Sequence, residues 1–112
     1  MFSMNFFNRG GLFKTMDINQ GVKDYGATPG AVLLDVRTPE EYGEGHIPGS
    51  KNIPLQKIQQ AESALGAKER ALFVYCHSGA RSSQAVRTLQ HMGYTNVTNI
   101  GGIASYSGKV VR

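Results

Sequence analysis

The apolar residues of this chain fall into short runs that alternate with segments of helical spacing. Two runs are continuous, Ala31–Val36 and Ala71–Cys76, and such runs are typical of central strands buried on both faces of a sheet. Three weaker runs, Phe13–Ile18, Lys51–Pro54 and Asn96–Ile100, are expected as further short strands. Strands that alternate with helices predict an α/β domain with a mostly parallel sheet.

Helix signals mark four segments between these strands: Asp17 to about Tyr25, a segment that begins at Thr38, Leu55–Gly66 and Ala80–Met92. Thr38 is the expected N-cap, because Pro39 follows it and Glu41, three residues on, completes a capping box. The segment Leu55–Gly66 carries one apolar face, formed by Leu55, Ile58, Ala61 and Leu65. The clearest helix ends at Gly93 and has an apolar stripe of Ala85, Val86, Leu89 and Met92.

Composition indicates one ordinary globular domain. The chain has 112 residues, 40% of them hydrophobic and 18% charged, which is enough for a single core. No apolar run approaches the ~20 residues that cross a bilayer. The apolar start lacks a basic segment ahead of it and a small-residue cleavage site, so a signal peptide is not expected and the expected location is the cytoplasm.

The charge pattern argues against two partner classes. The net charge is +4, from twelve Lys and Arg against eight Asp and Glu. These charges are scattered, so no basic patch for nucleic acid or for a membrane surface is expected. A modest positive field suits small anionic substrates, and it also serves solubility alone.

Cys76 is the only cysteine of the chain. An intramolecular disulfide, a Cys-rich metal site and a redox dithiol are therefore excluded, and no metal or cofactor is expected. Any group that becomes attached to Cys76 has to leave to another molecule. Two interpretations of this residue compete: a small buried residue that ends a strand, and a reactive thiol.

The turn between the Cys76 strand and the next helix favours the reactive thiol. It consists of Cys76, His77, Ser78, Gly79, Ala80 and Arg81, and ligand sites of open α/β sheets gather at the carboxyl ends of strands. With Gly79 free to take a positive φ, backbone N–H groups can curl around the sulfur beside the helix N-terminus. Such surroundings lower a thiol pKa. Arg81 adds a cation, and Ser78 and Ser82 offer hydroxyl donors; His77 is expected to point outward more than into the loop.

The sequence resembles the single-domain rhodaneses, thiosulfate-type sulfurtransferases whose loop reads Cys-x-x-Gly-x-[Arg/Thr]. Cys76, Gly79 and Arg81 match that loop at the right spacing. A second family signature matches at Asp35, Val36, Arg37, Glu41, Gly45, His46, Ile47, Pro48, Gly49, Ser50, Asn52, Ile53 and Pro54. The segment Gly93–Gly108 resembles the family's closing segment, with Tyr106 where many members carry tryptophan, a difference expected to affect packing only. Residues 1–12 fall outside the resemblance.

The resemblance implies a three-layer α/β/α domain over residues 13–112 with a mostly parallel five-stranded sheet, preceded by an arm of residues 1–12. It also implies that Cys76 carries sulfur as a persulfide from a small anionic donor such as thiosulfate to cyanide or an external thiol, including a protein thiol. The donor site would then be His77, Ser78, Gly79, Ala80, Arg81 and Ser82. Asp35, Arg37 and His46 would shape the rim, with Arg37 as a further cation behind the site.

Three alternatives remain open at this stage. Phosphatases and arsenate reductases of this fold use a Cys-x5-Arg loop, whereas only four residues separate Cys76 from Arg81, which makes a smaller cradle. Rhodanese-like domains also serve as binding modules, usually when the cysteine is replaced. A sulfur carrier to one dedicated partner would use the same persulfide chemistry.

Overall fold

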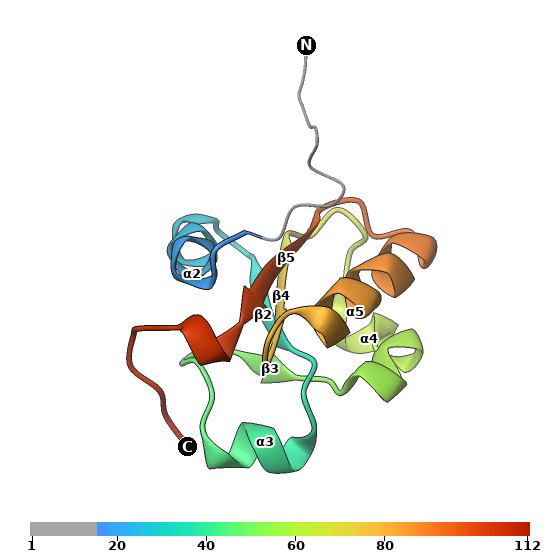
Figure 1. The fold of residues 1–112 in the computed structure, drawn as a ribbon. Helices are drawn as coiled ribbons and strands as arrows, with labels where there is room; N and C mark the ends of the chain where they lie inside the picture. Colours follow the sequence, from blue (N-terminus) through green and yellow to red (C-terminus); the bar gives the residue numbers. More distant parts are fainter. Residues whose placement is uncertain (1–15) are drawn as a thin grey trace.

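A computed structural model describes residues 16–112 of the chain. Its helices and strands are α2 (Ile18–Ala27), β2 (Val32–Asp35), α3 (Pro39–Glu44), β3 (Lys51–Asn52), η2 (Leu55–Gln60), α4 (Glu62–Leu65), β4 (Leu72–Cys76), α5 (Ala80–His91), β5 (Val97–Gly102) and η3 (Ile103–Ser105). The expected arm of residues 1–12 lies outside the described residues. Strands and helices alternate as the apolar pattern predicts, and Figure 1 shows them in three layers.

The sheet has the order β3-β2-β4-β5, and every neighbouring pair is parallel. Four strands stand where five are expected, so the prediction of a five-stranded sheet is corrected for the described residues. The first expected strand, Phe13–Ile18, lies partly outside them. Its described end is not a strand, because Asp17 is the N-cap of α2 and Ile18 begins that helix. The N–H of Met16 donates a backbone hydrogen bond to the Asn99 carbonyl.

The central strands β2 and β4 are buried along their whole length, and successive residues alternate between two cores. One core lies between the sheet and η2, α4 and α5; it contains Leu34, Val74, Cys76, Ala85 and Leu89. The other lies under α2 and contains Ile18, Leu33, Phe73, Tyr75 and Ile100. Tyr106 packs against this second core, which agrees with its expected packing role. The side chain of Cys76 therefore faces α5.

Three of the four expected helices agree with the structure and one divides. The helix expected from Asp17 to about Tyr25 is α2, with Asp17 as its N-cap. The N-cap Thr38 and Glu41 form the predicted capping box of α3, with Pro39 at the first position. The apolar stripe of α5 is confirmed, and Gly93 follows that helix with φ 104°. The segment Leu55–Gly66 is not one helix but the 3₁₀ helix η2 followed by α4, joined at Ala61. Its buried residues are nevertheless those of the expected apolar face, Ile58, Ala61 and Leu65.

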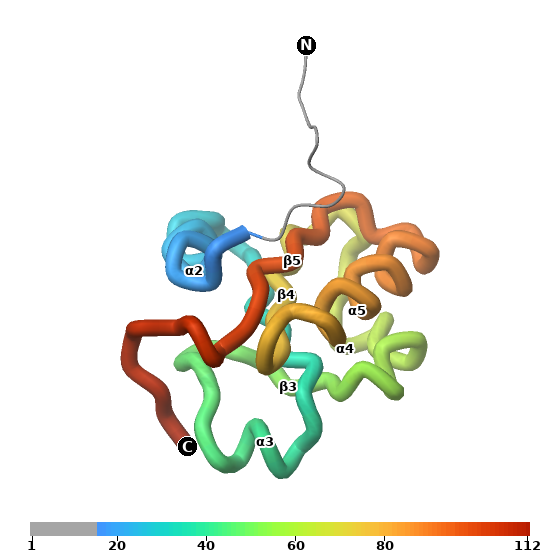
Figure 2. The backbone as a smooth tube through the Cα atoms, in the orientation of Figure 1, coloured from blue at the N-terminus to red at the C-terminus, as the bar shows by residue number. Residues whose placement is uncertain are grey.

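Parallel strands bring their carboxyl ends to one edge of the sheet, at the lower end in Figure 1, where α3 and the C-terminal segment lie. The C-terminal segment runs beside the loop that follows α3 (Figure 2). His46 and Val111 join the two segments through a pair of backbone hydrogen bonds of 2.8 and 2.9 Å. No helix among residues 16–112 is both long and apolar enough to span a membrane.

Candidate active site

Cys76 ends β4 at the carboxyl edge of the sheet, and its residue is 1% exposed. The chain leaves the strand through His77 and Ser78, and Gly79 takes the N-cap position of α5 with φ 110°. Residues with a side chain avoid that conformation, so glycine permits the tight turn back toward the sulfur. The N–H of Gly79 donates a hydrogen bond of 3.0 Å to the Sγ of Cys76. This N–H points at the sulfur, as an anion cradle in the loop would require.

Several dipoles converge on this sulfur. Burial of the thiol acts to raise its pKa, because a buried thiolate loses its water. Against this, the Ser82 hydroxyl and the backbone N–H groups of Ser82, Gly79 and Ser78 lower the pKa of Cys76, and the net shift is downward. The Ser82 hydroxyl lies 3.5 Å from Sγ. Cys76 is therefore a buried sulfur whose surroundings favour the thiolate.

Asn99 accepts a hydrogen bond from the Ser82 hydroxyl, and it is not among the residues predicted for the site. Its Oδ1 accepts hydrogen bonds from the Ser82 hydroxyl (2.8 Å) and from the N–H of Gly101 (2.9 Å). A register shift between β4 and β5 pairs Val74 with Asn99 but Tyr75 with Gly101. This bulge aims the Asn99 side chain across the sheet edge to α5. The sequence signal is the glycine pair that ends β5, because glycines in a strand often mark a bulge or a close backbone approach.

Gly102, the second glycine of that pair, packs against the loop that follows Cys76. A Cβ at Gly102 would overlap the His77 carbonyl oxygen and lie 2.5 Å from the Ser78 Cα. The backbone of β5 therefore packs directly against the Cys loop. The His77 carbonyl also accepts a hydrogen bond from the N–H of Ala104 in η3. Both His77 and Ser78 are exposed, as expected for a histidine that points outward.

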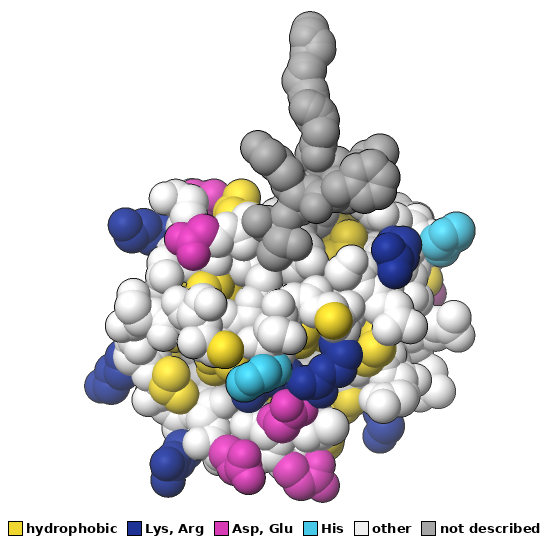
Figure 3. All heavy atoms as spheres, in the orientation of Figure 1, with side chains coloured by type: hydrophobic (Ala, Val, Ile, Leu, Met, Phe, Trp, Pro, Cys, Tyr) yellow, Lys and Arg dark blue, Asp and Glu magenta, His cyan; other side chains and the backbone are white. Residues whose placement is uncertain are grey.

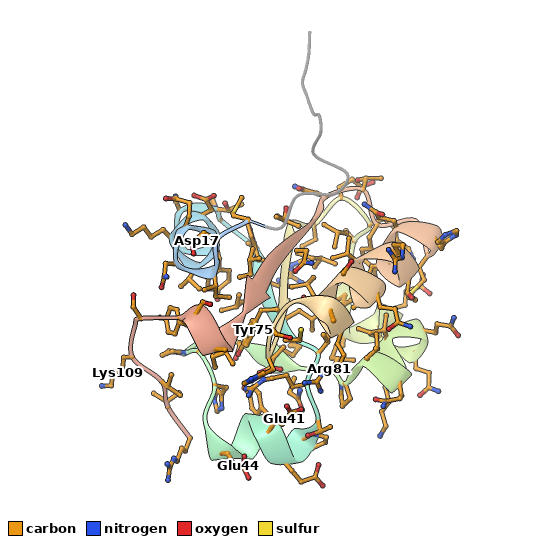
Figure 4. All side chains as sticks on the ribbon, in the orientation of Figure 1. Asp17, Glu41, Glu44, Tyr75, Arg81 and Lys109 are labelled. Carbon is orange, nitrogen blue, oxygen red and sulfur yellow. The ribbon has the colours of Figure 1, made fainter. Side chains whose placement is uncertain are left out.

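Arg81 reaches from the first turn of α5 to α3. Its guanidinium makes a two-point ion pair with Glu41, with N–O distances of 2.8 and 3.0 Å. The labelled side chains of Glu41 and Arg81 point toward each other in Figure 4. This ion pair lowers the pKa of Glu41 to about 2. The pKa of Arg81 is raised, mainly by Glu41 and further by the charges of Cys76 and Asp35.

Asp35 and Arg37 pair with each other, and Arg37 also bonds the backbone at the end of α3. The carboxylate of Asp35 accepts hydrogen bonds from the guanidinium of Arg37, the shortest 2.7 Å, and from its backbone N–H at 2.9 Å. A further bond of 2.7 Å joins Arg37 to the Gly45 carbonyl. Both residues are buried. Asn52 of β3 donates to the carbonyls of both, at 3.0 Å each. This buried network fixes the rim between β2 and α3.

The ring of His46 bonds the backbone of α3. Its Nδ1 is 2.9 Å from the Tyr42 carbonyl, and its ring stacks on the Tyr42 ring at 3.7 Å between centroids. This arrangement agrees with the structural role expected for His46. Among residues 16–112, no group of three or more His, Cys, Asp or Glu side chains is placed to hold a metal ion.

Comparisons with known proteins fit this geometry. A family model described as a rhodanese-like domain matches residues 19–109. The thiosulfate sulfurtransferase PspE of Escherichia coli is 42% identical over 71 residues, which cover 62% of this chain and 68% of PspE. The putative sulfur carrier protein YrkF of Bacillus subtilis is 38% identical over 78 residues, covering 69% of this chain but only 42% of YrkF.

Solved structures give the same answer for the fold. A structure of a rhodanese with anions from E. coli superposes with a TM-score of 0.69 at 37% identity, covering 73% of this chain and 98% of that one. The family match spans most of the sequence and includes Cys76, its loop and the rim residues. The chain belongs to the rhodanese-like domain family.

Proposed function

We propose that the protein is a sulfurtransferase that carries a sulfane sulfur as a persulfide on Cys76. The observation that carries the proposal is the buried Sγ at the carboxyl end of β4, with the Gly79 N–H 3.0 Å away and the Ser82 hydroxyl at 3.5 Å. These donors favour a sulfur anion at this point, which a nucleophilic thiolate requires. Relatives named as sulfurtransferases and as a putative sulfur carrier support the same chemistry.

The first half-reaction loads the cysteine. The Cys76 thiolate attacks the outer sulfur of a donor such as thiosulfate, a new S–S bond forms, the donor's S–S bond breaks, and sulfite leaves with the electron pair. The product is a persulfide anion on Cys76. Inward N–H groups stabilise its outer sulfur in the manner of an oxyanion hole. Because Cys76 is 1% exposed, a narrow terminal sulfur atom fits this approach better than a bulky electrophile.

The second half-reaction removes the outer sulfur from Cys76. An external thiolate or cyanide attacks the outer sulfur of the persulfide, and the S–S bond breaks to return the Cys76 thiolate. The acceptor has to be another molecule because the chain has one cysteine. The ion pair of Arg81 with Glu41 argues against a phosphatase, in which a guanidinium binds the substrate oxyanion. Arg81 is already bonded at two points by Glu41.

The test is a mass measurement on the intact protein. Incubation with thiosulfate or polysulfide is expected to add the mass of one sulfur atom to Cys76, and cyanide is expected to remove it with release of thiocyanate. Cys76→Ser should gain nothing. No adduct with thiosulfate, polysulfide or mercaptopyruvate would overturn the proposal, whereas Cys76-dependent hydrolysis of aryl phosphates would replace it with the phosphatase.

A further inference from the structure

Both arginines at the rim around Cys76 are held by carboxylates. Arg37 is bonded to Asp35, with a shortest N–O distance of 2.7 Å, and Arg81 to Glu41 at 2.8 and 3.0 Å. The sulfur itself is surrounded by backbone N–H groups and the Ser82 hydroxyl. Figure 3 shows basic and acidic side chains in contact on the face of the molecule that it presents. A charged donor therefore meets ion pairs of no net charge at this rim.

We propose that Glu41 is a specificity-determining residue, which neutralises Arg81 and so directs the site toward thiol persulfides and away from doubly charged thiosulfate. This inference rests on the proposed sulfurtransferase function and names its preferred donor class. In the loading step, the Cys76 thiolate attacks the outer sulfur of R–S–S⁻. The new S–S bond forms on Cys76, the donor's S–S bond breaks, and R–S⁻ leaves with the electron pair.

Glu41 is fixed in place by its own helix. Its Oε1 accepts a hydrogen bond of 2.9 Å from the Thr38 N–H, and the Glu41 N–H donates to the Thr38 hydroxyl at 3.2 Å. These bonds form the capping box of α3. The pKa of Glu41 is lowered to about 2, so the carboxylate is charged at every pH relevant to a cell. The carboxylate that neutralises Arg81 is therefore held in place by the capping box of α3.

The position of Arg81 makes its neutralisation matter for the donor. Its side chain comes from the first turn of α5, the helix whose N-cap residue Gly79 bonds the sulfur. The charges of Cys76 and Asp35 both raise the pKa of Arg81, so the guanidinium lies within electrostatic reach of the sulfur. A dianion that approaches Cys76 feels the Glu41 charge twice as strongly as a monoanion does. Glu41 therefore selects by donor charge.

The experiment compares two donors on the full-length protein. We would measure kcat/KM for thiosulfate and for the persulfide of 2-mercaptoethanol, which carries a single charge, with wild type and Glu41→Gln. Glutamine retains the capping box but removes the charge. The matched control is Glu44→Gln: Glu44 lies on the same helix and points away from Arg81 in Figure 4.

We expect Glu41→Gln to raise kcat/KM for thiosulfate roughly tenfold and for the persulfide roughly threefold. Because the interaction energy scales with the donor's charge, a change of roughly threefold for the monoanion becomes roughly tenfold for the dianion. The ratio of the two values then rises about threefold, falls back at high salt, and stays unchanged in Glu44→Gln. Arg81→Gln, which leaves Glu41 unpaired, should shift the ratio in the opposite direction and serves if Glu41→Gln fails to fold.

An unchanged ratio in both folded variants, or the same shift in Glu44→Gln, would overturn the inference while leaving the sulfurtransferase function intact. A wild-type protein that takes sulfur from neither donor would instead overturn the proposed function. The two failures are therefore distinguishable in one set of measurements.

Discussion

Gly102→Ala tests whether β5 positions the Cys loop. The backbone of Gly102 has φ −127° and ψ 143°, which alanine adopts without strain. The added methyl group, however, meets backbone atoms of His77 and Ser78. Those atoms cannot rotate away as a flexible side chain would. The effect of the substitution is therefore steric, and it acts on the loop that holds the sulfur.

The size of the effect follows from the contact distances. The Cβ would lie 2.5 Å from the Ser78 Cα, whereas ordinary van der Waals contact begins at 3.4 Å. The loop or the strand must therefore move by roughly 1 Å, and overpacking of this kind costs about 1–3 kcal/mol. A domain with ~5–15 kcal/mol of stability remains folded. A displacement of about 1 Å at the reacting atom, in contrast, costs on the order of a hundredfold in rate.

The assay uses the single cysteine. The rate of Cys76 alkylation by iodoacetamide is measured against pH, and thermal unfolding is followed by circular dichroism. We expect the alkylation midpoint of Gly102→Ala to move to higher pH, because the N–H groups that lower the pKa of Cys76 are displaced, and we expect sulfur transfer to fall about a hundredfold. Gly26→Ala in α2 is the control. A Cβ there meets no atom within 4 Å, and it should stabilise the helix by about 0.5–1 kcal/mol without changing Cys76.

The prediction is refuted if Gly102→Ala stays folded and keeps both the wild-type alkylation profile and the wild-type transfer rate. In that case β5 moves and the loop after Cys76 does not, so Gly102 matters only for the packing of β5. A loss of activity that merely parallels a loss of folded protein would also contradict the positioning role.

Three further predictions concern the charges and hydroxyls of the site. Ser82→Ala removes the hydroxyl that is hydrogen-bonded to the sulfur and lowers the pKa of Cys76, so this pKa rises and alkylation at neutral pH slows several-fold. Asp35→Ala leaves the buried Arg37 guanidinium without its carboxylate and should cost about 3–5 kcal/mol in urea unfolding. The folded-state pKa of Glu41 is depressed to about 2, so its contribution to stability is present above its unfolded pKa of ~4.3. Thermal melts should show the advantage of wild type over Glu41→Gln disappearing as the pH falls from ~4.3 to about 2.

Each of these predictions has a matched control with the same type of substitution. Ser83→Ala changes the neighbouring hydroxyl and should leave the alkylation profile unchanged. Asp17→Ala removes an exposed carboxylate whose side chain makes no cap hydrogen bond, and it should cost about 1 kcal/mol or less. Glu44→Gln should show no acid-dependent difference from wild type. Equal effects in a variant and its control would assign the effect to general perturbation rather than to the named contact.

Features that a few neighbouring residues encode could be predicted from the sequence alone. Continuous apolar runs of strand length predict β2 and β4 because they are typical of strands buried on both faces. The box of Thr38 and Glu41 predicts the start of α3 because both bonds close within one turn. Cys76 could be placed at the carboxyl end of a strand, before Gly79 and a helix, from the local pattern alone.

Contacts between segments far apart in the chain could be seen only in the folded structure. Glu41 and Arg81 are forty positions apart. The local sequence around Glu41 predicts its capping role but not its ion pair with Arg81. Asn99 reaches Ser82 only because a bulge in β5 turns its side chain toward α5. Ile18, the last residue of the strand expected at Phe13–Ile18, is instead the first residue of α2, because Asp17 is the N-cap of that helix.

Local signals thus predict where Cys76 lies, because turns and caps involve only near neighbours in the chain. Whether Arg81 near that sulfur is paired with Glu41 depends on how α3 and α5 pack against the sheet, which the local sequence does not encode.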